Sequence, residues 1–109
     1  MAYDENLAKR IRKLLADWPG CTEKKTFGGL SFLLQGNVAC GVLKDDMIVR
    51  IEPGQHDAAI ANPHVRTFDY TGRPMKGWIM VGPNALASDE DIKEWAFKGV
   101  QYAFSLPPK

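Results

Sequence analysis

The sequence predicts an α+β fold, a two-layer sandwich in which helices cover one face of a mainly antiparallel five-stranded sheet. Apolar residues recur at helical spacing near both ends of the chain, and between residues 23 and 81 the pattern changes to short alternating runs. The turns between these runs are short, which favours antiparallel neighbours. The expected order is a helix, three strands, a helix, two strands and a helix. Helices gathered on one face of an antiparallel sheet bury both apolar surfaces in two layers.

Residues 4–18 form the first expected helix. Asp4 and Glu5 fall in its first turn, where negative charge suits the helix dipole. Pro19-Gly20 ends it. Its apolar side chains recur every three or four positions and define one stripe: Leu7, Ile11, Leu14, Leu15 and Trp18.

Three strands are expected next, at residues 30–34, 38–43 and 47–52, with tight polar turns at 35–37 and 44–46 between them. Alternation is clearest in the third strand. There Met47, Val49 and Ile51 would share one face of the sheet, because successive side chains of a strand point to opposite faces.

The second half of the chain continues with a short helix over residues 55–61 and strands over 65–70 and 76–81. Ser88 is a good N-cap for a last helix over residues 89–105. That helix is expected to bury one stripe: Ile92, Trp95, Ala96, Gly99, Tyr102, Ala103 and Leu106.

Composition bounds the classes of protein to consider. The chain has 109 residues, 45% hydrophobic and 25% charged, which is typical of one globular domain, and we take residues 1–109 as that domain. Fourteen basic residues face thirteen acidic ones, so the strong basic excess of a dedicated nucleic-acid binder is missing. The first residues lack the pattern of a signal peptide, and no apolar run approaches the ~20 residues of a membrane span. We expect a cytoplasmic protein without membrane contact.

Three stretches resemble a known family: TEKKTFGGL at residues 22–30, CGV at 40–42 and FDYTGRPMKGW at 68–78. Together they resemble the amino-terminal domain of the TfoX/Sxy family, known as regulators of natural competence, and the likeness covers almost the whole chain. The resemblance implies an α-β(3)-α-β(2)-α two-layer sandwich. Family members often have methionine where this chain has Thr26. Full-length competence regulators add a second, helical domain after this one, and we expect these 109 residues to hold the first domain alone.

Residues of catalytic or metal-binding type do not form a recognisable constellation. Cys21, Cys40, His56 and His64 lack the paired spacing of a zinc site, so we expect no metal and no cofactor. We read both cysteines as reduced thiols, with Cys40 a small core residue. Gly28-Gly29 precedes a strand rather than a helix, which indicates a turn or bulge and not a phosphate-binding loop.

The last helix carries more apolar residues than one buried stripe needs. Phe97, Val100 and Phe104 lie beside the main stripe at spacings of three and four residues. Two interpretations stay open: the helix sits deep between layers, or this strip contacts another chain. A symmetric homodimer is the commonest contact of the second kind.

The turn at residues 71–78 is a second candidate contact. Arg73 and Lys76, with Trp78 beside them, would suit phosphate, a carboxylate or the acidic face of a protein partner. The competing interpretation is a rigid hairpin with Trp78 in the core.

Basic residues of the first helix and the segment after it offer an alternative, nucleic-acid contact, or simply a solvated face. They are Lys9, Arg10, Arg12, Lys13, Lys24 and Lys25. The sequence therefore predicts a non-enzymatic regulatory or interaction domain that acts through protein contacts. The alternative is a nucleic-acid-binding transcriptional accessory, and a small-ligand-binding or enzymatic domain comes third.

Overall fold

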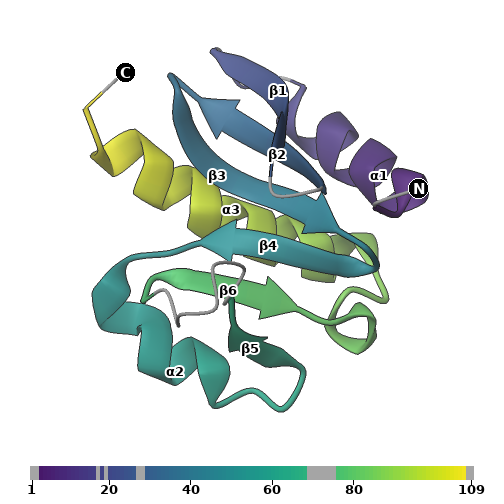
Figure 1. Ribbon diagram of the computed structural model, residues 1–109, viewed down its shortest axis with the longest axis vertical. Helices are drawn as coiled ribbons and strands as arrows, with labels where there is room; N and C mark the ends of the chain where they lie inside the picture. The colour runs from purple at the N-terminus through teal and green to yellow at the C-terminus, as the bar shows by residue number, and fades with distance from the viewer. Residues whose placement is uncertain (1–2, 17, 19, 27–28, 69–75, 108–109) are drawn as a thin grey trace.

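The computed structural model describes residues 3–16, 18, 20–26, 29–68 and 76–107. Its described residues form one six-stranded sheet in the order β1-β2-β3-β4-β6-β5, and every neighbouring pair is antiparallel. Figure 1 shows the path of the chain. The strands are β1 (Cys21–Thr26), β2 (Gly29–Leu34), β3 (Asn37–Leu43), β4 (Asp46–Arg50), β5 (Val65–Thr67) and β6 (Trp78–Val81). The helices are α1 (Glu5–Leu15), α2 (His56–Ile60) and α3 (Asp89–Ser105), with single 3₁₀ turns at Pro53–Gln55 and Pro83–Ala85.

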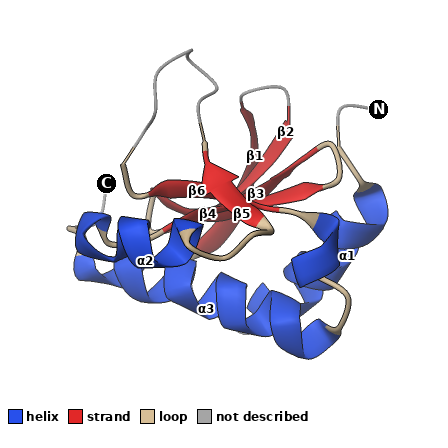
Figure 2. Ribbon diagram, turned by 90° about the horizontal axis from the view of Figure 1, so that it is seen from below, coloured by secondary structure: helices blue, strands red, loops and turns tan. Residues whose placement is uncertain are grey.

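The α-helices lie together on one side of the sheet, as Figure 2 shows, so the predicted α+β two-layer arrangement is confirmed. The long helix α3 crosses β3 and β4, while α1 and α2 flank it. The core lies between the two layers. Its fully buried members come from every part of the chain and include Ile11, Leu15, Phe32, Val42, Met47, Val49, Ile79, Val81 and Ile92.

The predicted count of five strands is wrong, because a strand precedes the first one expected. The strand β1 pairs with β2 from Cys21↔Leu34 to Thr26↔Gly29. Its sequence, CTEKKT, has no apolar alternation because β1 is an edge strand with little to bury. Lysines on an edge strand also discourage pairing with other chains. The observed order therefore has four strands before α2, where both the sequence pattern and the family resemblance implied three.

Most other predicted elements are present with shorter bounds. The first helix ends at Leu15, and β6 begins at Trp78 rather than at residue 76. The strand predicted over 65–70 is present as β5 and ends at Thr67, while residues 69–70 lie outside the described residues. The last helix has the predicted bounds and the predicted Ser88 cap, whose Oγ accepts from Asp91 N–H at 3.1 Å.

Helix α3 packs unusually close to the sheet at Gly99. A Cβ on this residue would lie 2.0 Å from the carbonyl oxygen of Ala39 on β3, so only glycine fits. The close approach also buries the next residue, Val100, which is 2% exposed. Placing Val100 on a surface strip was therefore wrong, because the buried arc of α3 is wider than one stripe.

A smaller apolar cluster lies on the other face of the sheet, since Ile48 and Met80 alternate with core residues along β4 and β6. Phe68 completes it, with Leu43 and Trp78 packed at its side. On the helical side of the sheet, buried His56 joins α2 to β5 and to the residue that precedes β6. Its Nδ1 accepts from Gly77 N–H at 2.9 Å, so Nε2 carries the proton and donates to Thr67 Oγ1 at 3.0 Å.

Among the helices described here, none has both the length and the apolar character needed to cross a membrane.

Candidate functional site

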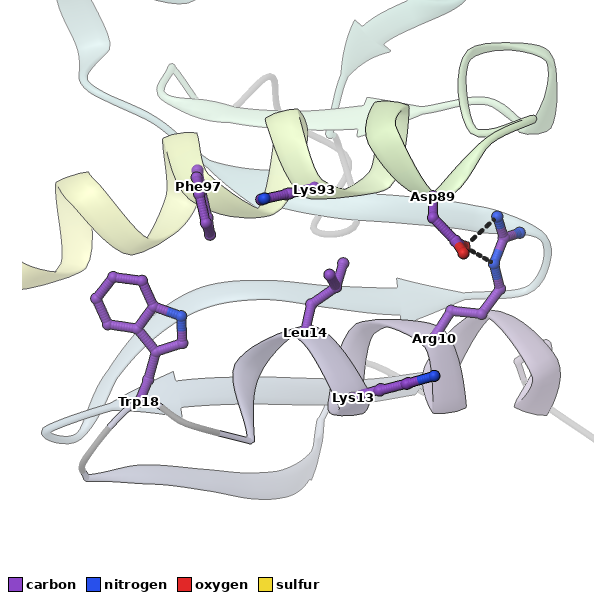
Figure 3. Close-up of a pocket in the computed structure, with 7 residues that line it drawn as sticks. All are labelled: Arg10, Lys13, Leu14, Trp18, Asp89, Lys93 and Phe97. Atoms are coloured by element: carbon purple, nitrogen blue, oxygen red, sulfur yellow. Dashed lines mark hydrogen bonds and ion pairs between the residues drawn. The ribbon is translucent and has the colours of Figure 1, made fainter.

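A groove of about 760 Å³ lies between α1 and α3 on the helical side of the molecule. We call it the α1–α3 groove, and Figure 3 shows its lining. Its walls are formed by Arg10, Lys13, Leu14, Trp18, Asp89, Lys93 and Phe97. A groove of this size is within the range of ligand sites, and its position between two helices is one where such sites occur.

Helical spacing explains why these residues meet. In α1, Leu7, Ile11 and Leu15 are buried towards the sheet. Arg10 and Leu14 therefore lie along the flank that faces α3, and Trp18 follows just after the end of the helix. In α3 the wall residues Asp89, Lys93 and Phe97 are spaced by four, so they form one row on the helix surface.

Charge is unevenly placed along the groove. Arg10 and Asp89 close one end, with Nε and Nη2 of Arg10 at 2.9 and 2.8 Å from Oδ1 of Asp89. These two charges neutralise each other. Lys13 on α1 and Lys93 on α3 remain, and within the described ranges neither makes an ion pair. The groove therefore presents two ammonium groups, one from each wall.

Aromatic rings dominate the other end. Trp18 stacks edge-on against Phe97 with ring centroids 5.9 Å apart, and it lies 5.6 Å from the ring of Phe104. We call Trp18, Phe97 and Phe104 the aromatic strip. Phe97 is 37% exposed and Phe104 38% exposed, so Trp18 covers both rings only in part. The Nζ of Lys93 lies 5.5 Å from the centroid of Phe97, which places a cation at the edge of the apolar surface.

The predicted partner-binding residues do not form one site. Phe97 and Phe104 belong to the aromatic strip, whereas Val100 is in the core. Lys76 is exposed. Trp78 packs on Phe68 in the smaller apolar cluster, with the two ring centroids 6.2 Å apart. Trp78 therefore fits the hairpin interpretation better than an exposed contact. Arg73 lies outside the described residues.

Sequence reasoning missed four wall residues. The sequence pattern assigned Leu14 and Trp18 to the buried stripe, and it gave no binding role to Asp89 or Lys93. The spacing of four residues from Asp89 through Lys93 to Phe97 was the available signal, because it places the three on one side of the helix. Nothing in the sequence indicated that α1 would lie against that side.

The basic residues proposed for nucleic acid are divided rather than gathered. Arg10 is paired with Asp89, and Arg12 makes a two-pronged contact with Glu23, at 2.6 and 2.7 Å. The Arg12 guanidinium lowers the pKa of the Glu23 carboxyl. Neighbouring Lys24 and Lys25 point to opposite faces of β1. Lys9 and Lys13 are also exposed on α1, so the six basic residues do not form one continuous patch.

The two thiols are free and differ in burial. Cys40 is fully buried, as predicted for a core residue, and burial raises its pKa. Cys21 is half-buried; burial first, and then the charge of Glu23, raise its pKa above the ordinary value. Raised values favour the unreactive protonated thiol. The described part of the chain contains no cluster of histidine, cysteine and carboxylate side chains able to hold a metal ion.

The fold and the groove define a small α+β domain with an open, cationic and aromatic groove between two helices. Comparison with family models finds one that matches residues 13–103, described as the TfoX N-terminal domain. The chain belongs to this family, which confirms the resemblance and suggests a domain like those of competence regulators. Comparison with curated proteins and with solved structures gives no significant match.

Proposed function

We propose that this domain is a non-enzymatic regulatory module that binds another protein through the aromatic strip and the adjoining α1–α3 groove. The observation that carries the proposal is the pair of phenylalanines on α3, which remain 37% and 38% exposed beside Trp18. Aromatic residues are enriched at protein interfaces, where they supply large contact area at small entropic cost.

The remaining features of the groove suit binding better than catalysis. Among the described wall residues the one carboxylate, Asp89, is held by Arg10, so it is not positioned as a free general base. The buried ring of His56 is fully used between Gly77 and Thr67, and Cys40 is inaccessible. These contacts favour a structural role for the groups that would otherwise be the first candidates for chemistry.

Nucleic-acid binding is the less supported alternative. The chain has a formal net charge of +1, and two of the candidate arginines already contact carboxylates. We expect labelled duplex DNA and single-stranded RNA to bind no tighter than the ordinary non-specific range of about 10⁻⁴–10⁻⁶ M at roughly 200 mM salt, measured by fluorescence anisotropy. Binding well below 1 µM that Arg12→Glu abolishes would replace the proposal with this alternative.

Quantitative co-purification tests the proposed contact. The tagged chain and its Phe97→Ser/Phe104→Ser variant would be expressed in the native host, and the proteins retained by each compared by mass spectrometry. Ile60→Ser is the matched control, because Ile60 on α2 is 37% exposed but lies away from the groove. We expect a partner that the wild type and Ile60→Ser retain and the double variant loses. Equal retention by all three, with the folded state verified by circular dichroism, would contradict the proposal.

A further inference from the structure

We propose that the α1–α3 groove binds an acidic amphipathic helix of a partner protein. The apolar stripe of that helix would pack on Leu14 and the aromatic strip, and its carboxylates would pair with Lys13 and Lys93. This inference rests on the proposed function and deepens it, because it names the chemistry and the backbone conformation of the bound segment.

The walls of the groove determine the backbone conformation of its occupant. Both walls are helices, α1 and α3, whose backbone groups are already paired within each helix apart from the ends. An extended segment laid here would find no strand edge to pair with and would leave its N–H and C=O groups without protein partners. A helix satisfies its own backbone, and its apolar face can lie in a hydrophobic groove.

The charges determine which helix fits. The pair Arg10–Asp89 is internally neutral, so the charged wall residues that make no ion pair within the described ranges are Lys13 and Lys93. They come from opposite walls, whose apolar side chains are Leu14 and Trp18 on the α1 side and Phe97 on α3 (Figure 3). A helix with carboxylates on both sides of an apolar stripe matches this arrangement, whereas a basic helix would be repelled from both walls.

Apolar anchors should come at helical intervals. The wall residues on α3 repeat every four positions, and the exposed ring of Phe104 extends the apolar surface beyond Phe97 by seven positions, or about two turns. Side chains at positions i, i+4 and i+7 of the bound helix would therefore reach successive parts of this surface.

An unbiased peptide selection tests the inference. The probe is a library of random peptides of about 16 residues, roughly four helical turns, displayed and selected against the purified wild-type chain. The same library is selected against Lys13→Glu/Lys93→Glu. Both lysines are exposed and make no ion pair within the described ranges, so this variant should keep the wild-type fold.

We expect the wild type to enrich acidic peptides with apolar residues at i, i+4 and i+7. Their affinity should fall about tenfold on the charge-reversed variant and at high salt, as expected for exposed charge pairs. Phe97→Ser should weaken them as well. Circular dichroism of the bound peptide should report helix.

Other outcomes overturn the inference and separate it from the proposed function. If the selected peptides are neutral or basic and fail to bind the Phe97→Ser variant, the aromatic strip would still be the contact surface, but the acidic helix would be excluded as its ligand. Acidic peptides that bind equally well to the wild type and to Lys13→Glu/Lys93→Glu would exclude the groove as their binding site. The selection could also enrich no peptide while sedimentation shows that the wild-type chain self-associates and that the Phe97→Ser variant is monomeric. That result would make a second copy of this chain the occupant of the groove. Enrichment of no peptide from a monomeric chain would also overturn the helix proposal, while the co-purification experiment would still decide the proposed function.

Discussion

The two sides of α3 differ in how tightly the structure constrains them. On the side that faces the sheet, Gly99 leaves no room for even one methyl group, and Val100 beside it is buried. On the side that faces α1, Phe97 and Phe104 stay more than one-third exposed next to an open groove. One side of the helix therefore maintains the fold, while the other leaves apolar surface exposed, as the proposed contact requires. Each side can be perturbed separately.

Gly99→Ala should have the largest effect on stability. The added Cβ would lie 2.0 Å from the Ala39 carbonyl oxygen, so α3 must move away from β3. We expect a loss of about 3 kcal/mol, at the upper end for overpacking a core, seen as a lower urea midpoint. Gly54→Ala is the control, because its Cβ would meet only Glu52 Oε1 at 4.0 Å. Equal midpoints for the two variants would contradict the close packing of α3 on the sheet.

Val100→Ala should cost about 2 kcal/mol, since it removes two buried methyl groups and leaves a cavity. Binding of any partner by the folded protein should be unchanged, because Val100 does not reach the surface. The measurements are urea denaturation and affinity for a selected peptide. A loss of stability below about 0.5 kcal/mol would contradict the burial of Val100 and support the exposed position predicted from the sequence.

Phe97→Ala should affect partner binding more than stability, the reverse of Val100→Ala. The ring is partly exposed and contacts Trp18, so we expect a stability loss of only about 1 kcal/mol from the lost aromatic pair and buried area. Partner binding should fall much more, by tenfold or greater, as at an interface hot spot. If Phe97→Ala lowered stability as much as Gly99→Ala and left binding intact, the aromatic strip would be part of the core alone.

Glu23→Gln should have the smallest effect. The side chains of Glu23 and Arg12 are 33% and 49% exposed, so solvent screens their attraction and we expect about 0.5 kcal/mol at neutral pH. The Arg12 contact lowers the pKa of Glu23, so its stabilisation is present above the ordinary glutamate range. That stabilisation is lost as the pH falls through the lowered pKa. Urea midpoints of wild type and variant should therefore converge in acid. A difference that grew on acidification would show that the ion pair is not its source.

The sequence predicted well those elements that bury an apolar stripe. Helix α3, its Ser88 cap and the strands from β2 to β4 follow from periodicity, capping and turn residues. The strand β1 was not predictable in this way, because an edge strand can be polar on both faces and still pair through its backbone.

The site was only half predictable for a related physical reason. Phe97 and Phe104 stood out as apolar surplus on α3, but Val100 could not be separated from them until the depth of helix packing at Gly99 was known. The groove itself depends on α1 lying beside α3, a contact between residues about eighty positions apart, such as Arg10 and Asp89. Neither helix alone carries a signal for that contact.

Photocrosslinking from position 97 tests most directly whether the α1-facing side of α3 is a binding surface. A photoreactive phenylalanine analogue would replace Phe97 or, as control, the equally exposed Ile60 of α2, in cells that naturally express the chain. We predict a discrete protein adduct from position 97 that is absent from position 60 and is displaced by excess of an acidic helical peptide selected on the groove. No adduct at position 97, or the same adducts at both positions, would contradict the assignment of this side of α3 to binding.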